Sequence, residues 1–230
     1  MPNTLAFTDD DSANRLLATS PLATLIGMML DQQFPMERAF FSPYLLQQRL
    51  GGTLDAAAIA AMDPDELDAV FRGPPALHRF PSAMATRCRD LCAAIVDDYD
   101  GDAAAIWREA ADGTDLLSRL KRLPGFGEAK SRIFVGVVGK RLGEGPAGWE
   151  EVAADWPSIA DVDSFDKVAE LREQKKARKA ANKAKRADEP GGGDKAGTAG
   201  RAGRAGKAAN RGKAGRAANR GNRAEQQAKD

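Results

Sequence analysis

The sequence is poor in the residues that build metal centres and disulfide frameworks. Its 230 residues include two cysteines, Cys88 and Cys92, and a single histidine, His78. Without carboxylates these side chains cannot supply the four ligands of a structural zinc site, and two thiols cannot hold an iron–sulfur cluster that needs four. We therefore expect no zinc, no iron–sulfur cluster and no disulfide framework, which fits a reducing compartment.

The sequence also lacks a long apolar run. The longest one, Leu22–Leu30, is far short of the ~20 residues that a membrane-spanning helix needs. The segment Met1–Asp11 is polar and acidic, unlike a secretory signal peptide. No segment sustains a two-residue alternation of apolar and polar side chains, so no strand is predicted. We expect an all-α protein of the cytoplasm that does not associate with a membrane.

Charge is divided unevenly along the chain, although the total is only +1. Residues 1–170 carry 16 Lys and Arg against 27 Asp and Glu, whereas residues 171–230 carry 18 against 6. From Lys175 onward there is no Val, Ile, Leu, Met or aromatic residue, so this part cannot bury enough apolar surface to offset its chain entropy. We expect a helical domain over residues 1–172 and a disordered basic tail over 173–230 that binds a polyanion.

The domain is expected to contain roughly ten short helices. Ser20 before Pro21 indicates a helix start, because Ser caps helices and Pro fits their first turn. A long helix over 81–98 is expected to turn its apolar side chains inward, namely Met84, Cys88, Leu91, Cys92 and Ile95. Further helices are expected near residues 12–19, 22–33, 35–50, 54–61, 63–71, 102–109, 114–122 and, in the tail, 174–186.

The most informative segment is Leu123–Gly127, which reads Leu-Pro-Gly-Phe-Gly between two segments of helical periodicity. Its glycines permit a sharp turn and leave no Cβ to keep a ligand from the backbone. Free N–H groups at the start of the following helix, together with the helix dipole, favour an anion such as phosphate. Side chains that follow the turn are expected to contact the same phosphate: Lys130, Ser131 and Arg132. By itself, such a turn is also a simple connection between two helices.

With these residues the sequence resembles the helix-hairpin-helix (HhH-GPD) superfamily of DNA glycosylases and base-excision repair proteins, in its short form without an iron–sulfur cluster. The family's hairpin matches Leu123–Gly127. The segment Met28–Gln33 is similar to the family's early helix, which ends in a turn that carries a Gln. The segment Pro157–Asp163 is similar to the region that delivers the family's catalytic Asp. The resemblance covers residues 20–170 and implies double-stranded DNA as the partner and a location at the nucleoid.

The resemblance implies a DNA-binding role for several residues. A Gln of the early turn would wedge into the duplex where a damaged base is flipped out. The hairpin backbone would hold a phosphate, and two of its carbonyls would bind a monovalent cation. The residues that match these roles are Gln32 and Gln33 for the wedge, Gly125, Phe126 and Gly127 for the phosphate, and Leu123 and Phe126 for the cation.

The resemblance also implies the chemistry. Asp163, with Asp161 behind it, would stabilise the positive charge that develops on the sugar as the base leaves. From the residues alone, Asp163 is an equally good N-cap for a helix over 164–171. Strand-cleaving family members carry a nucleophilic Lys two positions after the second hairpin glycine, where this chain has Ala129. Lys130 follows one step later, rotated by about 100°, so we expect it to face elsewhere and expect no lyase activity.

Three functions remain open at this stage. The first is a monofunctional DNA glycosylase. The second is a non-catalytic damage sensor or DNA-binding protein that keeps the hairpin and lacks the chemistry. The third is an interaction module whose tail binds RNA or an acidic protein.

Overall fold

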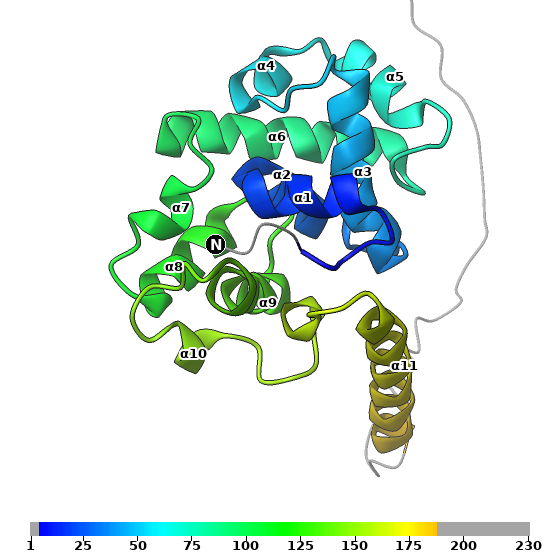
Figure 1. Cartoon of the computed structure of the whole chain (residues 1–230), viewed down its shortest axis with the longest axis vertical. Helices are drawn as coiled ribbons and strands as arrows, with labels where there is room; N and C mark the ends of the chain where they lie inside the picture. The colour runs from blue at the N-terminus through cyan, green and yellow to red at the C-terminus, as the bar shows by residue number, and fades with distance from the viewer. Residues whose placement is uncertain (1–4, 188–230) are drawn as a thin grey trace, which may run out of the picture. The chain divides into compact units, whose positions relative to one another are not determined.

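The computed structural model describes residues 5–187, and all regular structure in that range is helical (Figure 1). The expected all-α class is therefore confirmed. The α-helices are α1 (Asp11–Thr19), α2 (Pro21–Leu30), α3 (Met36–Arg49), α4 (Ala56–Ala61), α5 (Pro64–Arg72), α6 (Pro81–Tyr99), α7 (Ala105–Arg108), α8 (Gly113–Arg122), α9 (Glu128–Gly136), α10 (Trp149–Val152) and α11 (Asp166–Ala187). A π-helical turn, η1 (Val137–Leu142), extends α9, and a 3-10 turn, η2 (Ile159–Asp161), precedes α11.

The first two helices begin where the sequence predicts. The Asp10 carboxylate accepts the N–H of Ala13 at 2.7 Å, and the Ser20 hydroxyl accepts the N–H of Ala23 at 3.2 Å. Helix α2 is buried from its second residue to its last, as its apolar sequence predicts. It ends three residues before the expected Gln33, because the backbone leaves the helical conformation at Asp31, whose ψ is +67°.

One continuous core lies among three groups of packed helices. Helix α6 packs against α4 and α5, helix α3 packs against α1 and α2, and α8 packs against α9 and α10. The inner face expected for the long helix is confirmed in α6, since all five of its predicted side chains are buried. Its two cysteines are free thiols, and a hydrogen bond with Cys92 together with burial raises the pKa of Cys88.

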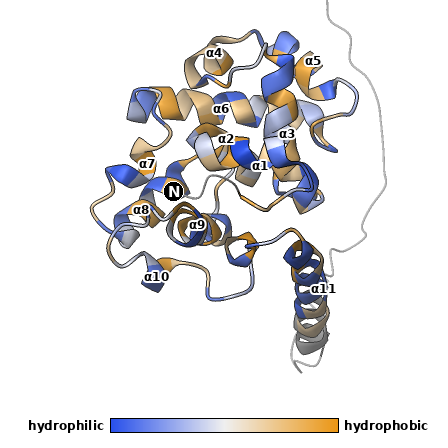
Figure 2. Ribbon diagram, viewed as in Figure 1, coloured by the Kyte–Doolittle hydropathy of each residue, from blue (hydrophilic) through white to orange (hydrophobic). Residues whose placement is uncertain are grey.

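Helix α11 crosses the expected boundary between residues 172 and 173. The helix expected over 174–186 is the later part of α11, which starts at Asp166. Val168 and Leu171 are buried in the core, and Arg172 forms an ion pair with Glu37 of α3. Figure 2 shows that the first turns of α11 are largely hydrophilic. The remainder of the expected tail, from residue 188 on, lies outside the described residues.

No helix within residues 5–187 is long and apolar enough to cross a membrane.

Candidate functional site

A glycine-bearing turn joins α8 to α9. Gly125 in this turn has a φ of +85°, in the left-handed region that glycine adopts without strain. A Cβ on Gly125 would lie 2.8 Å from Cδ of Arg87 and 2.9 Å from Cγ of Met29. The turn therefore lies directly against α6 and the end of α2, and only glycine fits there.

Two apolar side chains anchor the turn. Leu123 and Phe126 are buried, and the Phe126 ring meets Phe134 edge-on with 5.8 Å between the ring centroids. The N–H of Phe126 donates to the Leu123 carbonyl at 3.1 Å. The Phe126 amide, which the sequence places at a phosphate, is thus engaged within the turn. The Leu123 carbonyl, which the resemblance implies as a ligand of a monovalent cation, already accepts this hydrogen bond.

The other amides of the turn face no acceptor. Five N–H groups have no acceptor within residues 5–187. Two are in the turn, at Gly125 and Gly127, and three are the first amides of α9, at Glu128, Ala129 and Lys130. Gly127 is exposed, and no atom lies within 4 Å of the position its Cβ would take. Amides at the positive end of a helix dipole are suited to an oxyanion. The turn therefore presents an anion-binding backbone to solvent.

The three side chains expected at the same phosphate lie in different environments. The Lys130 ammonium donates to the Met29 carbonyl at 2.9 Å, so it points to the end of α2. Ser131 is completely buried, and its hydroxyl has no hydrogen-bond partner among the described residues. Arg132 donates to the Ala153 carbonyl at 2.9 Å. The backbone of the turn is exposed, whereas the polar groups of these side chains are engaged within the domain or buried.

The turn that follows α2 separates the two candidate glutamines. The Gln32 side-chain carbonyl accepts from the Arg87 guanidinium at 2.8 Å, and the Gln32 main-chain carbonyl lies 3.0 Å from Nε2 of His78. Gln33 is exposed, and its side chain makes no hydrogen bond within residues 5–187. Gln32 is thus fixed to the domain, whereas Gln33 is free to reach a ligand.

Asp31 and Lys130 are partly buried groups of opposite charge that influence each other electrostatically beside this turn. Burial raises the pKa of Asp31, an effect that Lys175 and Lys130 partly oppose. Burial lowers the pKa of Lys130 to about 8, against the opposing effect of Asp31. Asp31 is not among the residues expected at the site, because nothing in its local sequence indicates that α9 and α11 bring two lysines to it.

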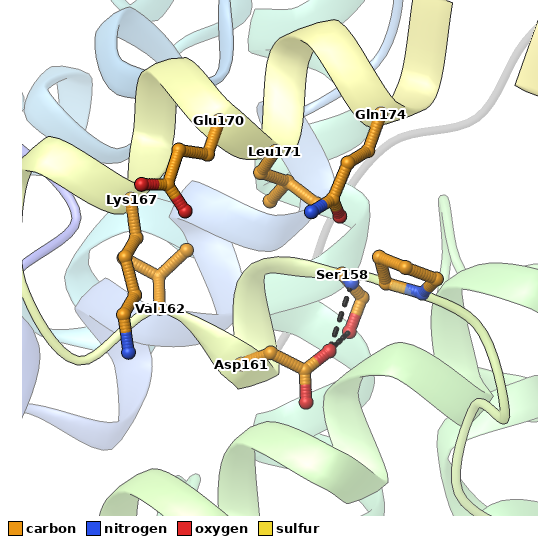
Figure 3. Close-up of a pocket in the computed structure, with 8 residues that line it drawn as sticks. Ser158, Asp161, Val162, Lys167, Glu170, Leu171 and Gln174 are labelled. Carbon is orange, nitrogen blue, oxygen red and sulfur yellow. Dashed lines mark hydrogen bonds between the residues drawn. The ribbon is translucent and has the colours of Figure 1, made fainter. Parts of the chain in front are cut away.

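Asp161, expected near the catalytic centre, is used in local structure. Its carboxylate accepts the Ser158 N–H at 3.0 Å in the capping box of η2 and pairs with the Lys140 ammonium at 2.5 Å. Burial raises the pKa of Asp161, but the hydrogen bonds from Lys140 and Ser158 outweigh this and keep it below its usual value. Figure 3 shows Asp161 and Ser158 at a cavity of about 70 Å³ that α11 covers.

Asp163, the first candidate for catalysis, lies on the surface. It pairs with Lys167 at 2.7 Å, and this hydrogen bond lowers its pKa. Helix α11 begins at Asp166, so Asp163 lies three residues ahead of it. No contact between Asp163 and the Asp31–Lys130 pair is present in the described part of the chain. Asp31 and Gln33 lie in the turn after α2, whose end contacts the α8–α9 turn, whereas Asp163 interacts with Lys167 and Arg141.

Aromatic rings and arginines from two loops and the start of α3 form a second feature beside Gln32. The His78 ring lies 4.6 Å from the Phe34 ring and 6.0 Å from the Phe80 ring, measured between centroids. The Arg38 guanidinium lies 5.0 Å over Phe34, and that of Arg79 lies 4.7 Å over Phe80. We call these five residues the aromatic–arginine patch. Its members come from segments more than 40 residues apart, so no sequence motif could have indicated it.

His78 is the fixed centre of this patch. Its Nδ1 accepts the N–H of Phe80 at 3.0 Å, so the ring proton is on Nε2 and is donated to the Gln32 carbonyl. Burial lowers the pKa of His78. The neutral ring therefore joins the patch to the turn after α2.

Residues 5–187 contain no group of three or more His, Cys, Asp or Glu side chains arranged to hold a metal ion.

Comparisons with family models, with curated proteins and with solved structures found no match for this chain.

Proposed function

We propose that this protein binds double-stranded DNA through the α8–α9 turn and acts in base-excision repair as a monofunctional DNA glycosylase of the helix-hairpin-helix type. The observation that carries the proposal is the set of unsatisfied amides at Gly125, Gly127 and the start of α9. Such amides hold a backbone phosphate without reading sequence. They fix the protein on the strand and leave recognition to the groups beside them.

Gln33 supports a role on duplex DNA. It lies in the turn after α2, and Met29 at the end of α2 touches the α8–α9 turn at Gly125. A free, exposed amide side chain next to a phosphate grip can fill the space that a flipped base leaves in the duplex. Gln33 is therefore the preferred wedge, and Gln32 holds the turn in place through Arg87 and His78.

The chemistry requires a carboxylate beside the sugar. Asp31 follows α2 directly, two residues before Gln33, and it interacts with Lys130 of α9. Asp163 remains the candidate that the resemblance implies. Both belong in the test, because a glycosylase that uses either one loses base release when that carboxylate becomes an amide.

A non-catalytic DNA-binding protein is the second candidate. It is favoured by the surface position of Asp163 and its ion pair with Lys167. It is also favoured by the use of Asp161 in the capping box of η2. In that case the turn and Gln33 would detect distorted DNA, and no base would be released.

The binding part of the proposal is tested at Glu128, the first residue of α9. Glu128→Pro removes one free N–H, and proline fits this helix position because Gly127 before it is extended. Glu128→Ala is the matched control, since it removes the same charge and keeps the N–H. We expect Glu128→Pro to bind a 20-base-pair duplex ~10-fold more weakly than Glu128→Ala, the loss of one hydrogen bond to a charged group. Equal affinities in fluorescence anisotropy would remove the basis of the proposal.

The catalytic part is tested by base release from duplexes that carry uracil, hypoxanthine, or oxidised or alkylated bases. A glycosylase releases at least one of these bases, and either Asp31→Asn or Asp163→Asn abolishes release while duplex affinity is unchanged. Release from none of the duplexes, with intact binding, assigns the protein to the second candidate function.

A further inference from the structure

We propose that the aromatic–arginine patch is a stacking platform for unpaired bases of a DNA strand next to the duplex held by the α8–α9 turn. The inference rests on the proposed DNA-binding function and adds a substrate class to it, namely duplex DNA with a single-stranded extension. It is carried by the exposure of Phe80, by the arginines around the rings and by the connection of the patch to the turn.

The apolar ring of Phe80 is exposed to solvent. It is 46% exposed, and Phe165 at 39% is the other large hydrophobic side chain that is exposed within the described residues. Phe80 is also held in place, since its N–H donates to His78 and α6 begins at the next residue, Pro81. The exposed part of this ring and the Arg79 guanidinium over it offer a planar ligand a surface for stacking. Every nucleobase has a planar face, which makes stacking independent of sequence.

The charges around the rings favour a nucleic acid over a protein or an apolar ligand. Arg38 and Arg79 are exposed, and Arg87 is partly exposed. None of the three forms an ion pair with a carboxylate within residues 5–187, and two of them lie over the aromatic rings. Unpaired guanidinium groups beside aromatic rings bind phosphates while the bases stack, which is the usual arrangement of single-strand sites.

The patch is joined to the phosphate-binding turn by direct contacts. His78 bonds to the main chain of Gln32, and the Gln32 side chain accepts from Arg87. The Arg87 side chain in turn touches Gly125. Three contacts, Gly125–Arg87, Arg87–Gln32 and Gln32–His78, connect the turn to the patch. A DNA strand that leaves a duplex held at Gly125 therefore passes close to the patch. This continuity is the reason to expect single-stranded DNA that extends from the duplex and not a separate ligand.

The test compares three DNA ligands with the full-length protein in fluorescence anisotropy: a blunt duplex, the same duplex with a five-nucleotide 3′ or 5′ extension, and the free single strand. We expect the extended duplex to bind more tightly than the blunt one. Phe80→Ala should remove this gain, a loss of ~10-fold on the extended duplex, because one stacked base contributes about a decade of affinity. Its affinity for the blunt duplex should be unchanged.

Matched variants separate stacking from other effects of substitution. Phe165→Ala removes a similarly exposed ring outside the patch and should leave all three affinities unchanged. Phe80→Trp keeps an aromatic face and should keep the gain. A 2-aminopurine in the extension should change fluorescence on binding to the wild-type protein and to Phe80→Trp, but not to Phe80→Ala. Circular dichroism confirms that each variant is folded.

The outcomes separate this inference from the proposed function. If Phe80→Ala and Phe165→Ala behave alike on the extended duplex, or if the 2-aminopurine signal does not depend on Phe80, the stacking platform is wrong. In that case the Glu128→Pro and Glu128→Ala difference on the blunt duplex still supports the turn. If that difference is absent while Phe80→Ala weakens binding to the free single strand, the duplex-binding proposal fails and the single-strand site stands alone.

Discussion

Lys130 combines a charge with an environment that disfavours it. Its ammonium is partly buried, bonds to a helix-end carbonyl and lies near Arg87, and only Asp31 compensates. Burial without a close ion pair costs free energy for the charged form. The residue is therefore the most perturbed base of the candidate site, and its protonation depends directly on Asp31.

We expect Lys130 to titrate with a pKa of about 8. Because this pKa lies below the ordinary value of 10.5, the folded state binds fewer protons than the unfolded state between these pH values. The contribution of Lys130 to the free energy of unfolding therefore rises as pH increases from about 8 to 10.5. NMR of ¹³C-methylated lysines measures the midpoint, and Lys130→Arg identifies its signal.

Asp31→Asn should move this midpoint to lower pH, since the carboxylate of Asp31 raises the pKa of Lys130. Asp163→Asn is the control, because Asp163 pairs with Lys167. A midpoint that responds equally to both substitutions would show that Asp31 and Lys130 do not interact.

At the scale of the elements, the α8–α9 turn depends on two glycines for different reasons. Gly125 has a positive φ and neighbours that a Cβ would contact at 2.8 and 2.9 Å. Gly127 has an extended backbone with a φ of −96° and no atom within 4 Å of its Cβ position. The first glycine shapes the turn, and the second keeps its amide accessible.

Gly125→Ala should therefore lower the free energy of unfolding by about 2 kcal/mol, from backbone strain and from the contacts with Arg87 and Met29. Gly127→Ala, the matched substitution, should change it by less than ~0.5 kcal/mol. Urea unfolding followed by circular dichroism measures both. If the two variants have the same stability, the tight contact of the turn with α2 and α6 is not present in solution.

At the scale of the whole molecule, the Lys and Arg residues of the C-terminal part lie partly in helix α11 and partly in residues 188–230. Arg172 and Lys175 of α11 contact α3, through Glu37 and Met36. The ten Lys and Arg of residues 188–230 follow that helix. A truncation that tests the tail must therefore keep α11, because a cut at residue 175 would also remove charges that lie near Asp31.

Removal of residues 188–230 should weaken binding to a blunt duplex by ~10-fold or more at low salt and flatten the dependence of affinity on salt concentration, because fewer counterions are released. A chain of full length with these ten Lys and Arg replaced by Gln is the matched control and should behave like the truncation. Anisotropy titrations between about 50 and 200 mM salt measure both slopes. An unchanged slope in the truncated protein would contradict a DNA-binding tail.

Much of the helical architecture follows from local sequence. Ser20 and Pro21 determine where α2 begins, and the spacing of Met84 to Ile95 determines which face of α6 is buried, because capping and periodicity act within a few residues of chain. The glycine turn at Leu123–Gly127 is found where the sequence places it. The end of α2 and the start of α11 differ from expectation, since both depend on contacts with distant residues.

The sequence by itself determined the all-helical class, most helix starts and the position of the glycine turn, because each rests on short-range backbone preferences and on apolar spacing. Only the tertiary structure decided which groups share the site. It directs Lys130 to the end of α2 beside Asp31, buries Ser131, leaves Gln33 free and assembles the rings of Phe34, His78 and Phe80. These relations join segments up to a hundred residues apart, and they arise from packing of whole helices, which no local pattern encodes.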